Sequence, residues 1–471
     1  MRMDEFFDPF YEGNHTKTLV NRYEQMRSSG ENFFFDVEEF EDLLDHYIDE
    51  RNSKKAFEVL AHARTQHPFA SDLSLREAEL LSTVGRNEEA LKVLEKIELL
   101  EPNNADLKIT HANILSQMGN IKLAIHVLKQ ALKWADEELT TEILLSISFE
   151  HQSLGEYNKA IGYLKKVLNR DPFNDDALYE LAFCLDQTEN DVGAVEFFKQ
   201  HVDDNPYSHH AWFNLGNAYL KLELYEKATE AFDYAIVIKE DFASAYFSKA
   251  LAYMSNEQYN EAITELHTSL EYELIDSVTY YYMGECFEKL GDLRNSEKYY
   301  KKATQSDPNM ANAWLGLATI ASDKGLEFES LALAKRAINI DAKNGDIWYT
   351  VANLHKKLGF LEESMEAFEK ALELTPTDFT IYLDYSELLF DHEMIDEANE
   401  VIETGMEKLP EQSEIYYRFA AYLLKNGQEE DAIDYLSQGI EIDSEKVSSF
   451  LEYYPESLSF SSVLSVIEKM K

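Results

Sequence analysis

Cysteine and long apolar runs are scarce in this sequence. Its 471 residues include two cysteines, Cys184 and Cys286, far apart in the chain, which excludes a disulfide framework and offers no metal-ligand spacing. No run of 18 apolar residues occurs, so no membrane-spanning helix and no direct membrane insertion are expected. The first residues lack the basic and then apolar pattern of a secretory signal. These absences predict a cytoplasmic protein.

Basic residues are few beside acidic ones. The chain has 43 Lys and Arg against 89 Asp and Glu, a formal net charge of −46. A surface of this charge repels phosphate backbones and anionic lipid heads. Nucleic acid is therefore excluded as a partner, and with it an RNA-processing helical-repeat protein. The charge favours the capture of neutral or basic protein segments.

Sequence motifs for catalysis and cofactor binding are also missing. The chain has no phosphate-binding glycine loop, HExxH pair, CxxC pair, nucleophile elbow or calcium-loop spacing. We therefore predict a protein that is not an enzyme and that has no cofactor. Among the histidines, His209 and His210 are the closest pair. Because adjacent helical residues do not face one another, no metal site is predicted there.

What the sequence does contain is a repeat of 34 residues. Aligning the chain on itself at this period gives twelve units from Val37 to Lys446, with one break in phase, the two extra residues Leu139 and Thr140. Such a period predicts stacked copies of one supersecondary unit. The units begin at Val37, Ser71, Ala105, Thr141, Asp175, His209, Ala243, Ser277, Ala311, Gly345, Phe379 and Ser413.

Each unit carries the signature of two packed helices. Position 20 is Ala or Ser in all twelve units, and position 8 is small in all but one, where Leu44 stands. Small residues at both positions let two helices approach closely. Glycine at position 15 in seven units suits the left-handed residue that ends a helix. Seven of the nine prolines fall at position 32, where the second helix is expected to end.

This pattern resembles the tetratricopeptide repeat, which it matches over most of the chain. The resemblance is weakest in the second and third units, where Glu77, Lys108 and His111 occupy places that are usually apolar. It implies an all-α, right-handed superhelical solenoid of about twelve helix pairs. First helices would line a concave surface and second helices a convex one. The sixth unit carries the pattern nearly whole, in Trp212, Leu215, Gly216, Tyr219, Ala228, Phe232 and Ala235.

The segments on either side of the repeats are predicted to be caps, because a terminal helix pair cannot bury its apolar face alone. Residues 1–36 form an aromatic-acidic leader and a capping helix, expected over Thr16–Ser28, and residues 37–446 hold the twelve units. Residues 447–471 are expected to form two short capping helices interrupted by Pro455. The aromatic residues of the leader are Phe6, Phe7, Phe10 and Tyr11.

By the resemblance, positions 2, 5, 6, 9, 12 and 13 of the first helices face the concave side. In units four to eight, positions 5 and 9 become mostly aromatic or apolar, although the pairing of helices does not require large side chains there. A contiguous apolar strip usually marks a binding surface, and two amides beside it suit a peptide backbone. Stacking between neighbouring units is the alternative explanation. The predicted groove residues are Phe149, Tyr179, Phe183, Phe213, Asn214, Asn217, Phe247, Leu251 and Tyr281.

Two further groups are defined by their repeat positions. Trp212, Trp314 and Trp348, all at position 4, are predicted to belong to the core. Acidic residues gather at the concave positions of the first and eleventh units, and the sixth and seventh units have none there. We expect these acidic ends of the groove to select basic flanks on a ligand. The acids are Glu38, Glu41, Asp42, Asp45 and Asp49, and Asp384, Glu387 and Asp391.

Together these features predict a non-catalytic adaptor or scaffold that binds a peptide segment or helix of a partner protein in its concave groove. The alternative is a structural subunit of a larger assembly, docked through the convex face or the N-terminal leader. Relatives that bind acidic chaperone tails use a set of Lys, Asn and Arg that no three neighbouring units supply here. The sequence leaves open the partner, the oligomeric state and whether the leader fills the groove.

Overall fold

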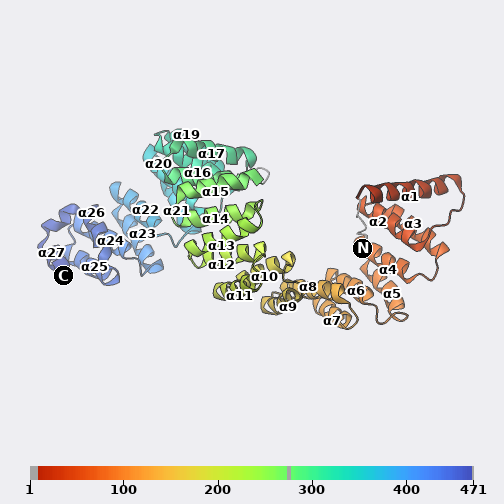
Figure 1. The fold of residues 1–471 in the computed structure, drawn as a ribbon. Coiled ribbons are helices and arrows are strands. Elements are labelled where there is room, and N and C mark those ends of the chain that lie inside the picture. The colour runs from red at the N-terminus through yellow and green to blue at the C-terminus, as the bar shows by residue number, and fades with distance from the viewer. Residues whose placement is uncertain (1–8, 273–276, 469–471) are drawn as a thin grey trace. The chain divides into compact units, whose positions relative to one another are not determined.

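The computed structural model describes residues 9–272 and 277–468 of the chain. These residues form α-helices joined by short turns, two short 3₁₀ helices and no strand (Figure 1). The helices fall into two compact units, Met1–Glu240 and Asp241–Lys471. Across the described ranges, no helix combines the length and the apolar character that crossing a membrane would require.

From Pro9 onward, the compact unit Met1–Glu240 contains one long helix followed by six helix pairs. The long helix is α1 (Pro9–Ser29). The pairs are α2 (Val37–Asp49) with α3 (Ser53–Gln66), α4 (Ser71–Thr83) with α5 (Asn87–Glu98), α6 (Ala105–Gln117) with α7 (Ile121–Ala131), α8 (Glu137–Ser153) with α9 (Tyr157–Arg170), α10 (Asp175–Gln187) with α11 (Asp191–Asp204), and α12 (His209–Lys221) with α13 (Tyr225–Ile238).

The unit Asp241–Lys471 contains six further pairs and a short terminal segment. The pairs are α14 (Ala243–Ser255) with α15 (Tyr259–Tyr272), α16 (Ser277–Lys289) with α17 (Leu293–Ser306), α18 (Ala311–Asp323) with α19 (Glu327–Ile340), α20 (Gly345–Leu358) with α21 (Leu361–Leu374), α22 (Phe379–Asp391) with α23 (Ile395–Lys408), and α24 (Ser413–Lys425) with α25 (Glu429–Ile442). The terminal segment holds η1 (Ser444–Lys446), α26 (Val447–Tyr453), η2 (Pro455–Ser459) and α27 (Ser461–Glu468).

The helix starts follow the 34-residue period of the sequence. In eleven of the twelve pairs the first helix begins at the first residue of a predicted unit. The exception is α8, which begins earlier, at Glu137, because Asp136 caps it by accepting a hydrogen bond from the backbone N–H of Leu139. The two extra residues, Leu139 and Thr140, therefore lengthen this helix at its N-terminal end and do not form a loop.

Position 15 of the repeat is the residue that separates the two helices of a pair. It has a positive φ in all twelve units. Seven of these residues are the predicted glycines, with φ of 69° to 79°, as a left-handed helix end requires. The other five are Arg51, Glu189, Glu223, Glu257 and Glu393, with φ of 51° to 62°. The turn between the helices thus imposes this conformation even on side chains that disfavour it.

Small residues allow the two helices of a pair to approach closely, as the sequence predicted. At position 8 of the sixth unit, a Cβ atom on Gly216 would lie 2.5 Å from the ring of Phe232 on the paired helix. At the same position of the eighth unit, a Cβ atom on Gly284 would lie 2.5 Å from the ring of Tyr300. Large rings thus fill the space that the glycines leave, and both Phe232 and Tyr300 are buried.

Both ends of the repeat array are covered. In α1, Leu19, Tyr23 and Met26 are buried in a cluster with residues of α2 and α3. This helix includes the predicted range and begins earlier, at Pro9. At the other end, Phe450 and Val463 are buried in a cluster with residues of α24 and α25. The leader residues Phe6 and Phe7, and the side chains of Phe10 and Tyr11, lie outside the described residues.

Candidate functional site

A cavity of about 360 Å³ lies on the fifth and sixth helix pairs, in the unit Met1–Glu240. We call it the aromatic cavity. Its wall comes from α10, α11 and α12. The lining residues are Tyr179, Ala182, Phe183, Asp186, Asp191, Ala194, Phe198, Phe213, Asn214, Asn217, Ala218, Leu220 and Lys221. Five of the nine predicted groove residues are among them.

Aromatic side chains give the cavity its chemical character. Tyr179 is 69% exposed and Phe183 is 40% exposed, although neither side chain is needed to join the helices of its pair. Phe213 is half-buried, with its ring centroid 5.9 Å from that of Phe232, and Phe198 is buried beneath them. A hollow with aromatic walls and few polar groups is suited to an apolar side chain of a ligand.

The repeat geometry explains why these residues meet. Tyr179 and Phe183 are four residues apart on α10, and Phe213 and Asn217 are four residues apart on α12, so each pair shares one helix face. α10 and α12 are the first helices of consecutive units and contact one another. Positions 5 and 9 of both units therefore face the same space.

The two amides beside the cavity have different roles. Asn214 is 8% exposed, and its Nδ2 donates a hydrogen bond to the backbone carbonyl oxygen of Leu178 at 3.1 Å. This hydrogen bond joins α12 to α10. The Asn214 N–H that was expected to bond the backbone of a ligand is therefore used within the protein. Asn217 is half-exposed, and no hydrogen bond joins it to the rest of the described chain. Asn217 is the amide that faces the cavity with its donor and acceptor unused.

Charged residues stand at the edge of the aromatic cavity. Asp186 of α10 and Lys221 of α12 form an ion pair, and Asp191 at the start of α11 also lines the hollow. Because both partners of the ion pair are half-exposed, the pair is weak and can be exchanged for contacts to a ligand. The rim therefore presents one cation and two carboxylates.

The other predicted groove residues do not line this cavity. Phe149 on α8 is exposed. Phe247, Leu251 and Tyr281 belong to the second compact unit, and all three are half-buried. The ring of Phe247 lies 5.7 Å from that of Tyr282. For this residue the contacts agree with stacking between neighbouring units.

Tyr281 is also packed among rings. Its centroid lies 5.8 Å from that of Tyr300 and 5.3 Å from that of Tyr282. Burial raises the pKa of Tyr281, and the neighbouring Glu285 carboxylate raises it further. Both neighbouring rings belong to the same repeat as Tyr281, so these contacts do not test the alternative of stacking between neighbouring units.

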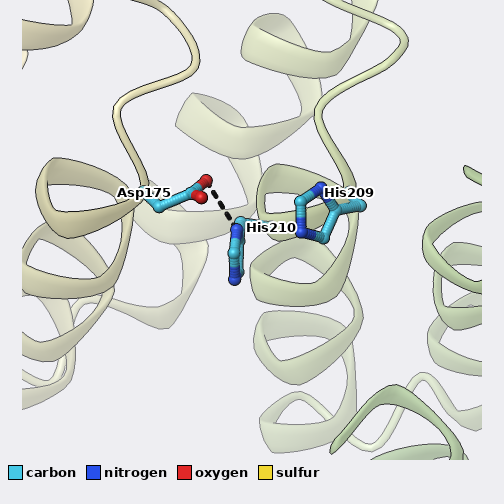
Figure 2. Close-up of side chains that lie close together, drawn as sticks. All are labelled: Asp175, His209 and His210. Carbon is cyan, nitrogen blue, oxygen red and sulfur yellow. Dashed lines mark hydrogen bonds and ion pairs between the residues drawn. The ribbon is translucent and has the colours of Figure 1, made fainter. Parts of the chain in front are cut away.

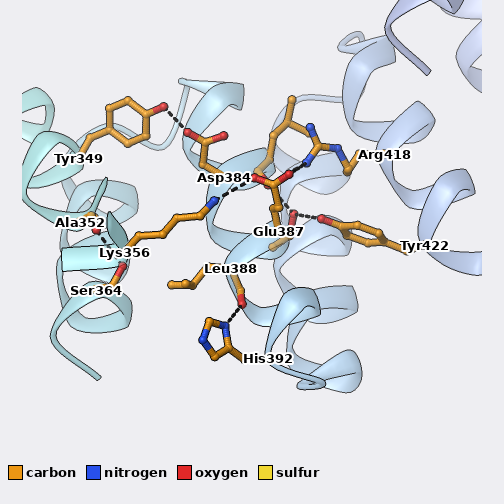
Figure 3. Close-up of polar contacts among 12 residues, drawn as sticks. Tyr349, Ala352, Lys356, Ser364, Asp384, Glu387, Leu388, His392, Arg418 and Tyr422 are labelled. Atoms are coloured by element: carbon orange, nitrogen blue, oxygen red, sulfur yellow. Dashed lines mark hydrogen bonds and ion pairs between the residues drawn. The ribbon is translucent and has the colours of Figure 1, made fainter. Parts of the chain in front are cut away.

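The acids of the eleventh unit are largely paired within the chain, as Figure 3 shows. Glu387 accepts from Lys356 Nζ at 2.9 Å and lies 3.7 Å from Arg418 Nη1. The hydroxyl of Tyr349 donates to Asp384 at 2.5 Å. The expectation of selecting basic flanks is therefore corrected for Glu387, whereas Asp384 keeps its charge because its partner is a neutral hydroxyl. Their partners come from the neighbouring tenth and twelfth units, so a count of acids within one unit could not reveal them.

Acids of the first unit are less completely paired. Asp45 forms an ion pair with Arg76 of the second unit. Partial burial raises the pKa of Glu41, and Arg76 opposes that rise. No ion pair joins Glu38, Asp42 or Asp49 to any described residue.

Comparison with known families identifies the repeat. Tetratricopeptide repeat families match residues 105–138, 213–270, 278–310, 345–378 and 413–446. The chain is a tetratricopeptide repeat protein. A further family, described as anaphase-promoting complex, cyclosome, subunit 3, matches residues 153–235, the range that contains the aromatic cavity.

Curated relatives of this tetratricopeptide repeat protein match it over part of its length. Protein bimA of Emericella nidulans is 22% identical over 172 residues, 36% of this chain and 21% of that protein. Anaphase-promoting complex subunit 3 of Schizosaccharomyces pombe is 20% identical over 174 residues, 37% of this chain and 26% of that protein. Subunit cut9 of the same organism is 28% identical over 136 residues, 27% of this chain and 20% of that protein. The chain thus spans about a quarter or less of the length of these relatives.

Solved structures of other tetratricopeptide repeat proteins are similar to the chain. The crystal structure of the APC/C hetero-tetramer Cut9–Hcn1 has a TM-score of 0.43 at 14% identity, and the match covers 91% of this chain and 94% of that one. The crystal structure of YrrB, described as a TPR protein with an unusual peptide-binding site, has a TM-score of 0.33 at 20% identity, covering 40% of this chain and 97% of that one.

The tryptophans at position 4 of three tetratricopeptide repeats are half-buried and do not belong to the fully buried core. Each nevertheless packs against a buried core cluster, so the sequence prediction holds for packing but not for full burial. Each indole N–H donates to the backbone carbonyl oxygen of the residue six positions earlier, at 2.9 to 3.0 Å. The tryptophan thereby ties the start of one repeat to the turn before it. The pairs are Trp212 with Pro206, Trp314 with Pro308, and Trp348 with Ala342.

Two adjacent histidines and an aspartate of the preceding repeat lie together (Figure 2). The rings of His209 and His210 are 4.1 Å apart, and His210 Nδ1 lies 2.6 Å from Asp175 Oδ1. Sequence spacing predicted that the histidines would not face each other, so their proximity corrects that inference. Asp175 and His209 each begin a helix. The positive end of a helix disfavours a bound cation, so we assign the Asp175–His210 contact to the joining of two repeats.

Proposed function

We propose that this tetratricopeptide repeat protein is a non-catalytic scaffold that binds a segment of a partner protein in the aromatic cavity. The observation that carries the proposal is the exposure of Tyr179 and Phe183 beside Phe213 on one 360 Å³ hollow. Folding gains little from rings left in water, whereas a ligand side chain placed between them would bury their surface. Aromatic anchors of this kind dominate many protein interfaces.

The polar groups around the cavity suggest how the segment would be held. Asn217 has an unused amide that would pair with the backbone of an extended peptide. Asp191, together with Asp186 once its ion pair with Lys221 is exchanged, would favour a basic residue next to the apolar anchor, and the −46 charge of the chain acts in the same direction. The preferred ligand is therefore an apolar residue flanked by a basic one.

A role within a larger assembly is supported by the comparisons. The family described as anaphase-promoting complex, cyclosome, subunit 3 matches the repeats that build the cavity, and two of the relatives described above carry the name of that complex. We infer that the scaffold binds its partner as part of a multi-protein complex. The second candidate is docking into such a complex through another face or through the N-terminal leader. The same relatives support it, and it differs from the first candidate in the surface that contacts the partner.

A crosslinking experiment separates these two candidates. A photoreactive phenylalanine analogue in place of Phe183 is expected to crosslink one distinct protein in cells of the source organism. The same analogue in place of Phe69, which is 98% exposed and outside the cavity, is the matched control. Tyr179→Ala with Phe213→Ala should reduce the Phe183 crosslink by at least about tenfold, since each aromatic anchor typically contributes about 1–3 kcal/mol.

The outcomes distinguish the surfaces. Crosslinking of the same proteins from both positions, or an unchanged yield in the double variant, would contradict binding in the aromatic cavity. A strong and specific crosslink from the Phe69 position alone would favour docking through another face. Circular dichroism of each variant shows whether the helices are intact.

A further inference from the structure

A second cavity, of about 520 Å³, lies on α17, α18 and α19 in the unit Asp241–Lys471. We call it the basic cavity. Its floor is apolar and includes the buried Ile320 and Ala321 together with Leu317. A shallower hollow along α17 adjoins it and shares Glu297, Lys301 and Gln305. The remaining lining residues of the cavity are Thr304, Pro308, Trp314, Lys324, Leu326, Glu329, Leu333 and Arg336.

The charge of this surface is opposite to that of the chain as a whole. The two hollows are lined by six basic residues and by two acidic ones, Glu297 and Glu329, whereas acidic residues outnumber basic ones 89 to 43 in the sequence. A local excess of four positive charges in so acidic a protein is not expected from composition. The basic residues are Arg294, Lys298, Lys301, Lys302, Lys324 and Arg336.

The carboxylates nearby do not neutralise these cations. Glu297 is shared between Lys301, at 2.5 Å, and Lys324. Among the described residues, no ion pair includes Arg294, Lys298 or Lys302. Glu297 is therefore the shared ion-pair partner of two lysines, and three more cations along α17 have no carboxylate partner among the described residues.

Aromatic rings hold several of the cations in place. The guanidinium carbon of Arg336 lies 3.6 Å from the ring centroid of Trp314. Lys302 Nζ lies 4.8 Å from the ring centroid of Tyr280, and Lys298 Nζ lies 4.9 Å from that of Tyr299. A cation over an aromatic face keeps its charge and N–H donors while losing conformational freedom. It therefore binds a carboxylate at a smaller entropic cost than a free side chain would.

The basic cavity is separate from the concave positions. Its α18 residues include Trp314, Leu317 and Ile320, at positions 4, 7 and 10 of the ninth unit. The positions expected to be concave are 2, 5, 6, 9, 12 and 13, and Tyr179, Phe183, Phe213 and Asn217 of the aromatic cavity occupy positions 5 and 9. The two cavities therefore use different faces of the first helices.

We propose that the basic cavity is a docking site for an acidic peptide segment of a partner protein, with an apolar side chain between its carboxylates. The apolar residue would lie against Leu326 and Leu333 above the apolar floor, beside the Trp314–Arg336 stack. The flanking carboxylates would bind Lys301 and Lys302 on one side and Arg336 on the other. The charge of this segment is opposite to that of the ligand proposed for the aromatic cavity.

The proposal is tested on the full chain with synthetic peptides. The probe is a fluorescein-labelled twelve-residue peptide of Asp, Glu and Ser with a central Leu. Comparison peptides replace its acids with Asn and Gln, or its Leu with Gly. Fluorescence anisotropy is expected to show binding of the acidic peptide that weakens with salt. Binding should fall at least about tenfold for each comparison peptide.

Charge-matched variants locate the site. Lys301→Glu with Lys302→Glu should weaken peptide binding at least about tenfold. Lys335→Glu with Lys343→Glu makes the same change in net charge at exposed lysines outside both hollows and should weaken it less than about twofold. Phe213→Ala, in the aromatic cavity, should leave the affinity unchanged, so a failure here is distinguishable from a failure of the proposed function.

Three results would overturn the proposal. The first is equal affinity for the acidic and the neutral peptide. The second is an equal loss of affinity in the two lysine pairs, because that would mean long-range attraction and no site. The third is tighter binding of a single-stranded RNA of equal charge, which would make the surface a polyanion-binding patch. Circular dichroism of each variant confirms that loss of binding is not loss of fold.

Discussion

Asn214 in α12 donates a hydrogen bond from Nδ2 to the backbone carbonyl oxygen of Leu178 in α10, over 3.1 Å. The twelfth repeat has a related contact, in which Arg418 Nη1 lies 3.4 Å from the carbonyl oxygen of Leu383 in the eleventh repeat. Asn214 and Arg418 both occupy position 6 of their units. This position therefore joins the first helices of neighbouring repeats at two places in the chain.

Asn214→Ala is expected to lower the free energy of unfolding by about 0.5–1.5 kcal/mol, because a buried hydrogen bond between repeats is lost. Asn217→Ala is the matched control. It removes the same side chain from the same helix, but one that makes no hydrogen bond to the described residues, and should change stability by less than about 0.5 kcal/mol. Urea denaturation followed by circular dichroism measures both. Equal losses would contradict the assigned role of Asn214.

Replacing a residue that is held in the left-handed conformation should have opposite effects at two equivalent turns. Glu223 has φ of 58° and Gly155 has φ of 69°, at the same position of their repeats. Glu223→Gly should stabilise the protein by about 0.5–1 kcal/mol, since it relieves the contact of Cβ with the backbone. Gly155→Ala should destabilise it by about 1 kcal/mol for the converse reason. Thermal unfolding measures both, and changes of the same sign would contradict this account.

The ion pairs of the eleventh repeat should contribute to stability in a salt-dependent manner. Glu387→Ala removes the shared partner of Lys356 and Arg418 and should cost about 1 kcal/mol at low ionic strength. Asp391→Ala removes an acid from the same helix that has no ion pair with a described residue, and should have little effect. Urea denaturation at low and high salt checks this. A loss for Glu387→Ala that salt does not reduce would contradict the ion-pair explanation.

Stability should fall at alkaline pH because tyrosines are buried. Burial, followed by the hydrogen bond to Asp384, raises the pKa of Tyr349 from 10.0 to about 12. The unfolded chain releases this proton first, so the stabilising contribution is complete below about pH 10 and is lost as the pH rises to about 12. Burial also raises the pKa of Tyr23 and of Tyr417 to about 12. The free energy of unfolding should therefore fall across this range.

Tyrosine variants isolate one contribution to this alkaline loss. Tyr349→Phe should make the fall shallower, whereas Tyr207→Phe, at an exposed position, should leave it unchanged. The measurement is urea denaturation at several pH values from about 9, where the contribution is complete, to about 11, where the two states differ in bound protons. An equally steep fall in both variants would contradict a contribution from Tyr349.

The sequence was sufficient for the fold because the signals that define it are local and repeated. A small residue at positions 8 and 20, a left-handed residue at position 15 and a proline at position 32 each act on their own turn or helix pair. Twelve copies make such a pattern unmistakable. The one irregular start, at Glu137, depends on the capping side chain of Asp136, which the period alone did not reveal.

The candidate site was predicted in part, for a related reason. The repeat register identified Tyr179, Phe183 and Phe213 as side chains that the helix pair does not require, and these three line the aromatic cavity. The register did not separate them from Phe247 and Tyr281, which do not line this cavity. Whether a ring stays exposed depends on the neighbouring side chains, both in its own repeat and in the adjacent one, and these follow no period.

The sequence by itself determined the helix pairs, their order and their turns, because these depend on contacts within 34 residues. Only the tertiary structure decided which polar and charged groups are paired, as with Asn214 to Leu178 and Glu387 to Lys356 and Arg418. It likewise brought the cations of α17, α18 and α19 to one cavity. The reason is physical: hydrogen bonds and ion pairs depend on distances between side chains of neighbouring repeats, and packing in three dimensions sets those distances.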